Sequence, residues 1–261
     1  TSCRMPFDVR WILISVFVSL LLSFFAIKAG LDRLPKDQGR KYAVNGELAK
    51  GKPRGAGLIF SLCCVFVFLV FVPFHWEYVI YYALFLLSML SGYLDDRSKH
   101  SWGELKKGLL DLAICLAASV TYLVFNGSHS LSLFGWTLVL PQWLFLIVAT
   151  FTLWVSINFT NCTDGVDGLL GTVSILSMAT FAVIFLLTSD SIDLAQMCFV
   201  FIASLLAYLA FNASPSMIIM GDAGSRMVGI FLGVMALKTH NLLFLIPAAL
   251  VIIFDGGIGL F

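Results

Sequence analysis

Long apolar runs separated by short polar segments repeat along the whole chain. Seven of these runs are long enough to cross about 30 Å of hydrocarbon as single helices. They lie near residues 11–30, 56–74, 77–94, 108–125, 142–158, 168–188 and 193–212. A shorter run follows over roughly 226–238, and a last run over 241–261 reaches the end of the sequence. The pattern predicts an all-α polytopic membrane protein with about nine visible helices in a single integral membrane domain, residues 1–261.

Two segments of this pattern need a separate interpretation. The first run is interpreted as a retained helix, because it is too long for a signal-peptide core, lacks a small-residue cleavage site and precedes further spans. Between the fourth and fifth runs, residues 127–141 alternate in part between apolar and polar side chains around a glycine. This alternation predicts a short external β-hairpin.

Lysine and arginine gather in the segments that follow the first and third runs. These residues are Arg33, Lys36, Arg40, Lys41, Lys50, Lys52 and Arg54 in the first segment, and Arg97, Lys99, Lys106 and Lys107 in the second. Because cytoplasmic loops carry an excess of such residues, both segments are predicted to be cytoplasmic and the N-terminus external. Alternation of the spans then puts the segments around Asp164 and Asp222 on the same side. Lys238 is the main positive charge expected on the opposite side.

Composition agrees with a membrane protein: 60% of the residues are hydrophobic, 24 are Phe and only 12% are charged. The net charge of +1 gives no whole-chain signal for nucleic acid or an acidic partner. Four cysteines lie inside apolar runs and one in a predicted loop, in the order Cys63, Cys64, Cys115, Cys198 and Cys162. We therefore expect small buried hydrophobic residues and neither a disulfide framework nor a zinc site.

Asp95 and Asp96 close the third apolar run. Adjacent carboxylates repel each other unless a cation or a proton intervenes, and a divalent metal ion is a natural neutraliser. The alternative is a helix end with solvated charges. The other polar clusters of the chain favour the metal.

A second cluster lies between the fifth and sixth runs. Two amides, two carboxylates and two glycines fall within eleven residues, at Asn158, Asn161, Asp164, Gly165, Asp167 and Gly168. Glycines let the backbone approach a ligand closely, while amides and carboxylates supply oxygen ligands and hydrogen-bond partners. The alternative, a polar turn in which Asp167 or Thr163 caps the next helix, explains one of these residues and leaves the rest.

A third cluster, Gly221 to Arg226, opens the eighth run. Ser225 and neighbouring backbone N–H groups are suited to hold phosphate at a helix N-terminus, with Asp222 keeping Mg²⁺ on that phosphate. Two basic features accompany it. Lys106 or Lys107 either reaches to lipid head groups or neutralises a diphosphate, and the segment Lys50 to Gly57 is either a topology signal or an anion contact.

The three clusters, in this order, resemble the signature of the polyprenyl-phosphate N-acetylhexosamine-1-phosphate transferases, glycosyltransferase family 4. The resemblance covers nearly the whole chain. It implies Mg²⁺-dependent transfer of a sugar-1-phosphate from a UDP-activated amino sugar to undecaprenyl phosphate, with release of UMP. The segment from Asp37 to Gly57 is most similar to the phospho-N-acetylmuramoyl-pentapeptide transferases of peptidoglycan synthesis. The alternative is the branch that transfers N-acetylglucosamine-1-phosphate for O-antigen or teichoic acid, whose acidic position on the ninth helix Asp255 fits.

The resemblance also implies roles for individual residues. The expected catalytic residues are Asp95, Asp96, Asp222 and Lys107, with Asp95 accepting a proton from the lipid phosphate or orienting it. The expected substrate-binding residues are Lys50, Asn158, Asn161, Asp164, Gly165, Asp167 and Ser225. The expected Mg²⁺ ligands are Asp222, Asn158 and Asp95. Whether transfer is direct or passes through an aspartyl intermediate stays open.

Family members have about ten helices and a late histidine-rich loop, so this chain is expected to be incomplete at its C-terminus. The resemblance further implies a bacterial inner-membrane location with a cytoplasmic active site, contact with membrane lipids, no nucleic-acid partner and a homodimer. Ile219 departs from the family pattern, since many relatives have an aromatic residue there. The competing class is an ion-coupled transporter, but its carboxylates belong near mid-membrane and these lie at helix ends.

Overall fold

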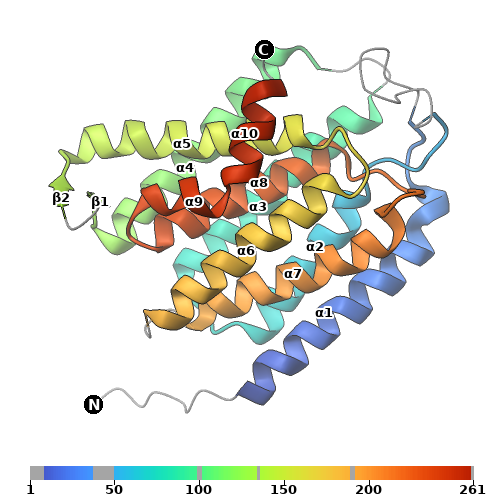
Figure 1. Cartoon of the computed structure of the whole chain (residues 1–261), viewed down its shortest axis with the longest axis horizontal. Coiled ribbons are helices and arrows are strands. Elements are labelled where there is room, and N and C mark those ends of the chain that lie inside the picture. Colours follow the sequence, from blue (N-terminus) through green and yellow to red (C-terminus); the bar gives the residue numbers. More distant parts are fainter. Residues whose placement is uncertain (1–8, 38–49, 99–101, 134–135, 189–191, 260–261) are drawn as a thin grey trace.

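The computed structural model describes residues 9–37, 50–98, 102–133, 136–188 and 192–259, and it confirms an all-α membrane architecture (Figure 1). Six helices are long and apolar enough to span a membrane, namely α1, α3, α4, α5, α6 and α7. The helices are α1 Val9–Gly30, α2 Ala56–Phe71, α3 Trp76–Arg97, α4 Glu104–Asn126, α5 Gln142–Thr163, α6 Leu169–Leu187, α7 Ile192–Asn212, α8 Gly221–Lys238, α9 Leu245–Ala248 and α10 Leu250–Gly259, with short 3₁₀ turns at Leu31–Arg33 (η1) and Leu242–Phe244 (η2). Cys63, Cys64, Cys115 and Cys198 are buried, as expected, whereas Cys162 is only partly buried.

Helix α8 forms the centre of the bundle, and every one of its residues is buried. Helices α2, α3 and α5 pack directly against it, while α1 packs on α2 and α7 at one side and α4 packs on α3 and α5 at the other. The helix begins at Gly221, earlier than the predicted start near residue 226. The third polar cluster is therefore the first turn of this central helix.

Glycines bring the neighbouring helices into backbone contact with the first turn of α8. A Cβ atom on Gly57 of α2 would collide with the backbone of Gly224, and one on Gly92 of α3 would collide with the backbone carbonyl of Asp222. Small residues allow this close approach in membrane bundles. These two contacts fix the position of Asp222 relative to α2 and α3.

Gly92→Ala is expected to destabilise the protein by about 1–3 kcal/mol, because the added methyl group overpacks a backbone contact. The matched control is Gly257→Ala on α10, where an added Cβ would meet nothing within 4 Å. The melting temperature in detergent measures both. Equal melting temperatures for the two variants would contradict the close contact between α3 and α8.

The prediction of a single ninth helix over 241–261 is wrong. Within the described part of this segment, η2, α9 and α10 are separate short pieces, and Ala249 leaves the helical region between the last two with φ −112° and ψ 25°. Pro247 lacks an N–H group and suits the first turn of a helix, so it fits the start of α9 and not the middle of a long helix. Figure 1 shows α10 turned across the direction of α9.

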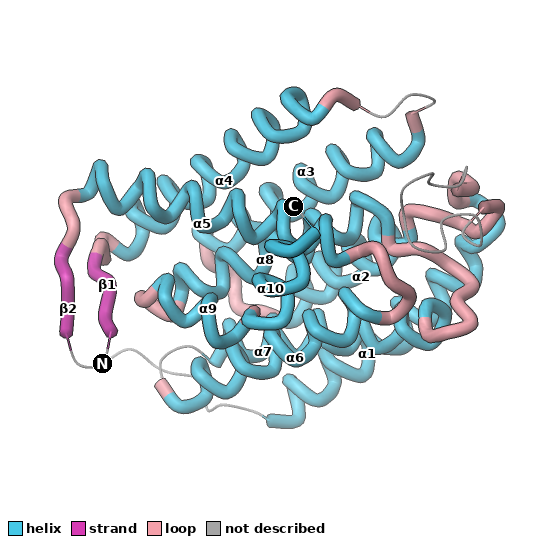
Figure 2. Tube along the Cα trace, turned by 45° about the horizontal axis from the view of Figure 1, so that its top comes forward, coloured by secondary structure: helices cyan, strands magenta, loops and turns pink. Residues whose placement is uncertain are grey.

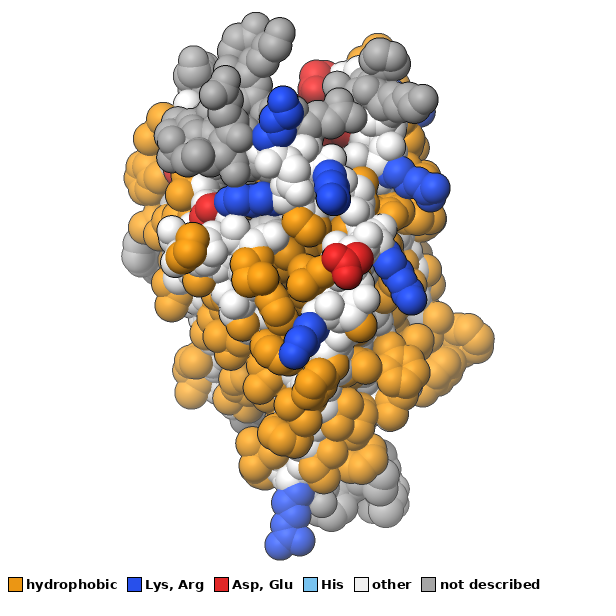
Figure 3. Space-filling view, turned by 90° about the vertical axis from the view of Figure 1, so that its right-hand side faces the viewer, with side chains coloured by type: hydrophobic (Ala, Val, Ile, Leu, Met, Phe, Trp, Pro, Cys, Tyr) orange, Lys and Arg blue, Asp and Glu red, His pale blue; other side chains and the backbone are white. Residues whose placement is uncertain are grey.

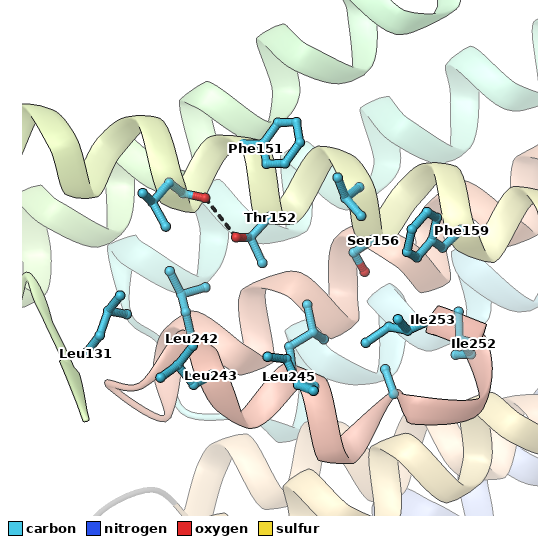
Figure 4. A pocket seen from close by; sticks show the side chains of 14 residues that line it. Leu131, Phe151, Thr152, Ser156, Phe159, Leu242, Leu243, Leu245, Ile252 and Ile253 are labelled. Carbon is cyan, nitrogen blue, oxygen red and sulfur yellow. Dashed lines mark hydrogen bonds between the residues drawn. The ribbon is translucent and has the colours of Figure 1, made fainter. Parts of the chain in front are cut away.

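The break in this segment leaves an apolar cavity of about 230 Å³ between α5 and the pieces η2, α9 and α10 (Figure 4). Phe151, Phe159 and Leu245 are among the side chains that line it. Thr152, which also lines the cavity, donates its hydroxyl hydrogen bond to the carbonyl of Val148 in its own helix at 2.8 Å. The wall of the cavity is therefore almost entirely apolar. The hydroxyl groups that line it, those of Thr152 and Ser156, already donate hydrogen bonds to backbone carbonyls.

The predicted hairpin is confirmed. Strands β1 Ser130–Leu133 and β2 Trp136–Val139 pair antiparallel, with Ser130 opposite Val139. Figure 2 shows the pair at one extremity of the bundle. Asn241, just after α8, holds β1 through a hydrogen bond from its side-chain amide to the Ser132 carbonyl at 2.7 Å.

Lys238, expected as a positive charge in a loop, is instead buried at the last turn of α8. Its ammonium group lies 2.9 Å from both carboxylate oxygens of Glu77 on α3 and 2.8 Å from the side-chain oxygen of Asn126 on α4. The expectation of a free positive charge in a loop is therefore wrong, because Glu77 neutralises the charge of Lys238 inside the bundle. We refer to Glu77 and Lys238 as the far-end pair.

Candidate active site

The three predicted clusters meet at one end of the bundle, which we call the acidic end. It consists of the last turn of α3, the first turns of α4 and α8, the end of α5 and the segment before α2. Figure 3 looks at this end, and Lys and Arg side chains are the prominent charged groups on it. The carboxylates of Asp95, Asp96 and Asp222 lie below that surface, with side-chain exposures of 4%, 0% and 9%.

Lys107 joins Asp95 and Asp222. Its ammonium nitrogen lies 2.7 Å from Oδ2 of Asp95 and 3.7 Å from Oδ2 of Asp222. The backbone N–H of Trp102 donates to the other oxygen of Asp95 at 2.6 Å. Lys106 instead lies over the Trp102 ring, 3.6 Å from its centroid. Of the two lysines that the sequence left open, Lys107 is therefore the one that faces the carboxylates.

Arg54 lies in this site but was not among the individual site residues predicted from the sequence. Its guanidinium contacts Asp96 through Nε at 2.8 Å, Asp222 through Nη2 at 3.1 Å and Asp37 through Nη1 at 3.3 Å. Lys50, which was predicted to bind substrate, is exposed in the same segment. A signal was present in the sequence, because Arg54 lies only two residues before the second apolar run, which begins at residue 56.

The carboxylates around Arg54 keep it charged. Burial lowers the pKa of the guanidinium, but the charges of Asp96, Asp222 and Asp37 raise it further, so the pKa lies above its ordinary value. A guanidinium presents several N–H donors in a fixed plane and can bind several carboxylates at once. Arg54 is therefore a permanent internal cation between two of the predicted catalytic residues.

The N-terminus of α8 is bound by carboxylates from two other elements. Gly221 adopts a positive φ of 74°, and its N–H donates to Oδ2 of Asp164 at 3.1 Å. The N–H of Ala223 donates to Oδ2 of Asp96 at 3.2 Å. A helix N-terminus favours negative charge. In this structure the two aspartates supply that charge at the predicted phosphate position.

Helix α5 extends to Thr163, so Asn158, Asn161 and Cys162 are helical and not in a loop as predicted. The side-chain amide of Asn158 donates to the carbonyl of Trp154 at 2.8 Å. That of Asn161 donates to the hydroxyl of Ser225 at 3.1 Å. Ser225 is completely buried, so its hydroxyl lies in the interface between α5 and α8.

The turn from Asp164 to Gly168 connects α5 to α6, and Gly165 and Asp167 are exposed on it. Asp167 lies 3.5 Å from the ammonium group of Lys52. The suggestion that Asp167 or Thr163 caps the next helix is wrong. Thr163 donates to the Phe159 carbonyl within α5, and the Gly168 N–H at the start of α6 donates to the side-chain oxygen of Asn212 at 2.8 Å.

Comparison with known proteins places the chain in a family. The sequence model of the family described as glycosyl transferase family 4 matches residues 78–240, which is more than half of the chain. The chain belongs to this family. The matched region contains Asp95, Lys107 and Asp222, while Arg54 lies before it.

Individual relatives in the family match three quarters of the chain or more. A phospho-N-acetylmuramoyl-pentapeptide-transferase from Treponema pallidum, strain Nichols, is 36% identical over 274 residues, which cover 95% of this chain and 73% of the relative. A protein of the same name from Listeria monocytogenes serovar 1/2a is 30% identical and covers 90% of this chain and 74% of the relative. One from Fervidobacterium nodosum is 32% identical, with 76% and 63% covered.

Carboxylates and two cations lie close together at the acidic end of this family member. Among the described residues, Arg54 and Lys107 lie among the carboxylates of Asp37, Asp95, Asp96, Asp164 and Asp222. Carboxylate oxygens, together with substrate phosphate and water, are the ligands by which proteins usually hold Mg²⁺. The donor set thus fits this cation.

The arrangement suits Mg²⁺ better than a metal held by protein ligands alone. Among the residues that the structure describes, no group of three or more His, Cys, Asp or Glu side chains could hold a metal ion. Mg²⁺ is usually bound by one or two carboxylates together with substrate phosphate and water. Asp95 and Asp222, which already share one cation in Lys107, fit that pattern.

Proposed function

We propose that the chain transfers phospho-N-acetylmuramoyl-pentapeptide from its UDP-activated form to undecaprenyl phosphate, with release of UMP and a requirement for Mg²⁺. The observation that carries the proposal is the largely buried cluster of five carboxylates around Arg54 and Lys107 at one end of a membrane bundle. Relatives with the corresponding name, which cover 90% to 95% of the chain, support this donor. In this proposal the acidic end faces the cytoplasm of a bacterium and the N-terminus is external.

The proposed reaction joins two phosphorylated substrates. An oxygen of the lipid phosphate attacks the β-phosphorus of the UDP-sugar, an O–P bond forms, and the bond from that phosphorus to UMP breaks. Both substrates are anions, so the work of the protein is to position them and to neutralise charge. The acidic end offers the components for both tasks in one place.

Asp95 is proposed to accept a proton from the lipid phosphate or to orient that phosphate, with Asp96 assisting. Lys107 is proposed to offset phosphate charge, because its ammonium group lies between Asp95 and Asp222, two of the proposed catalytic residues. Asp222, Asp95 and Asn158 are the proposed holders of Mg²⁺. When bound there, Mg²⁺ supplies positive charge to the diphosphate.

The nucleotide is proposed to bind at the exposed turn after α5. Gly165 and Asp167 are accessible on this turn, and Lys52 lies beside it. Asp164 and Asn161 connect the turn to α8 through Gly221 and Ser225. Because the Ser225 hydroxyl is buried, its proposed role is now to hold α5 against α8 and not to touch phosphate.

N-Acetylglucosamine-1-phosphate transfer is the alternative, and Asp255 is the observation that favours it. This carboxylate is exposed on α10, next to Gly256, which packs against Phe159 near the end of α5. The resemblance to this branch of the family implies an acidic residue at this position. The transporter hypothesis is set aside, because the chain belongs to a transferase family and the carboxylates of its three polar clusters gather at one end of the bundle.

The test offers the purified chain undecaprenyl phosphate with either UDP-N-acetylmuramoyl-pentapeptide or UDP-N-acetylglucosamine and measures UMP release. We expect UMP from the pentapeptide donor in Mg²⁺, and a fall of at least about tenfold in EDTA that added Mg²⁺ reverses. Release from UDP-N-acetylglucosamine alone would assign the alternative donor. No release from either donor, or equal release in EDTA, would reject the proposed reaction or its metal.

A further inference from the structure

A second set of polar side chains lies one helical turn deeper in the bundle than the acidic end. Residues four apart on a helix share a face. On α8, Arg226 follows Asp222 by four positions; on α4, Asp111 follows Lys107 by four positions. On α3, which runs toward the acidic end, Ser91 precedes Asp95 by four. Each residue of the deeper set therefore lies beneath a residue of the proposed site.

One guanidinium joins the three helices at this depth. Nη1 of Arg226 donates to Oδ1 of Asp111 at 2.9 Å and to the hydroxyl of Ser91 at 3.4 Å. Arg226 and Asp111 are each only 3% exposed. Within the described part of the chain, Nε of Arg226 has no hydrogen-bond partner. The pair is thus almost completely removed from solvent and not fully satisfied.

Stability alone does not explain such a pair. Replacing a buried ion pair by apolar side chains of similar size is often neutral or stabilising, because the desolvation of both charges offsets their attraction. A directional contact between charged groups does, however, restrict how neighbouring helices slide and rotate. Arg226 and Asp111 supply that restriction one turn from Lys107 and Asp222.

We propose that Arg226 and Asp111 are positioning residues, which hold α4 and α8 in the register at which Lys107 reaches both Asp95 and Asp222. Ser91 connects α3 to the same guanidinium. The kinetic consequence of this inference rests on the proposed function, whereas its geometric consequence, the placement of the Lys107 ammonium group, does not.

The far-end pair provides an internal control. Glu77 and Lys238 also form a buried ion pair between α3 and α8, but at the opposite ends of these helices. The two double variants to compare are Arg226→Met with Asp111→Leu, and Glu77→Leu with Lys238→Met. Both remove a complete buried pair from the bundle. If the Arg226 and Asp111 pair had a purely structural role, the two double variants would change the labelling of Lys107 and the kcat to a similar extent.

The geometric readout is the reaction of Lys107 with an amine-directed acetylating reagent, measured by mass spectrometry on the full chain in detergent. Lys107 is shielded, with 14% of its side chain exposed, while its neighbour Lys106 is exposed and serves as the reference within the same peptide. We expect the ratio of Lys107 to Lys106 labelling to rise several-fold when the Arg226 and Asp111 pair is removed. The far-end variant should keep the wild-type ratio.

The kinetic readout is kcat and KM for UMP release. Removing the Arg226 and Asp111 pair is expected to lower kcat by about tenfold or more, since small displacements of positioning groups cost about that much. The far-end variant should stay within about threefold of wild type. A wild-type labelling ratio together with wild-type kcat in the Arg226 and Asp111 variant would overturn the inference, as would equal effects in the two double variants.

If the double variant does not fold, Asp111→Asn tests the same point, because it keeps the shape of the side chain and removes its charge. The labelling ratio of Lys107 to Lys106 and the kcat for UMP release are then measured on this variant, and wild-type values of both would overturn the inference. If wild-type protein releases no UMP from any donor, the proposed function fails, while the labelling ratio still decides whether Arg226 and Asp111 place Lys107.

Discussion

Asp222→Asn is expected to lower kcat for phosphosugar transfer by about 10³-fold, the cost of removing a central electrostatic group from a buried site. Asp222 is shared by Arg54 and Lys107 at 3.1 and 3.7 Å, and it is a proposed ligand of Mg²⁺. The amide keeps the size of the side chain and loses its charge. UMP release by purified enzyme at saturating substrates measures the effect.

The matched control for this variant is Asp193→Asn on α7. Asp193 lies outside the acidic end and approaches only the exposed His75, at 3.9 Å, among the salt bridges of the described residues. Its turnover should equal that of wild type. Both variants should keep the wild-type melting temperature within a few degrees. Turnover by Asp222→Asn at the level of the control would remove Asp222 from the proposed catalytic residues.

Arg54→Met is expected to reduce kcat/KM by about 10²-fold and to destabilise the protein by about 3–5 kcal/mol. The reason is that Asp37, Asp96 and Asp222 all lose the cation that they contact between 2.8 and 3.3 Å. Methionine keeps much of the length of the side chain, so packing changes little. Urea or thermal unfolding in detergent, together with the UMP assay, measures both effects.

Two further substitutions separate charge from geometry at this position. Arg54→Lys keeps the charge but has no planar fork of donors, so it should recover stability better than activity. Arg33→Met removes an exposed positive charge from the same basic segment and should leave both unchanged. If Arg33→Met were as damaging as Arg54→Met, the contact between Arg54 and the three carboxylates would not be the cause.

The apolar pattern predicted six of the spanning helices, because helix length and hydrophobicity follow from the thickness of the bilayer. The run predicted over 56–74 is instead the 16-residue helix α2, which is shorter than these six. Partial alternation over residues 127–141 likewise predicted the hairpin, and the structure confirms it. The convergence of Asp95, Asp164 and Asp222 could be anticipated because alternating spans return to the same side. These features depend on local sequence and on counting of spans.

Features that depend on tertiary contacts could not be predicted in this way. Arg54 lies in a basic segment where several cations looked equivalent, and only packing against Asp96 and Asp222 distinguishes it. Ser225 was expected to face a ligand, but its place in the interface with Asn161 follows from how α5 crosses α8. The hydrophobicity of the residues after Asn241 predicts one helix, because hydrophobicity alone contains no information on where a helix ends and the chain changes direction.

The complete enclosure of α8 has a consequence for biogenesis. This helix carries Asp222, Arg226 and Lys238, and charged side chains exposed to lipid at mid-bilayer cost about 2.5–3.5 kcal/mol each. We therefore do not expect it to leave the insertion machinery for lipid by itself. Helices α2 to α7 precede α8 in the chain. The helices that enclose α8 on these sides are therefore already synthesised when it emerges from the ribosome.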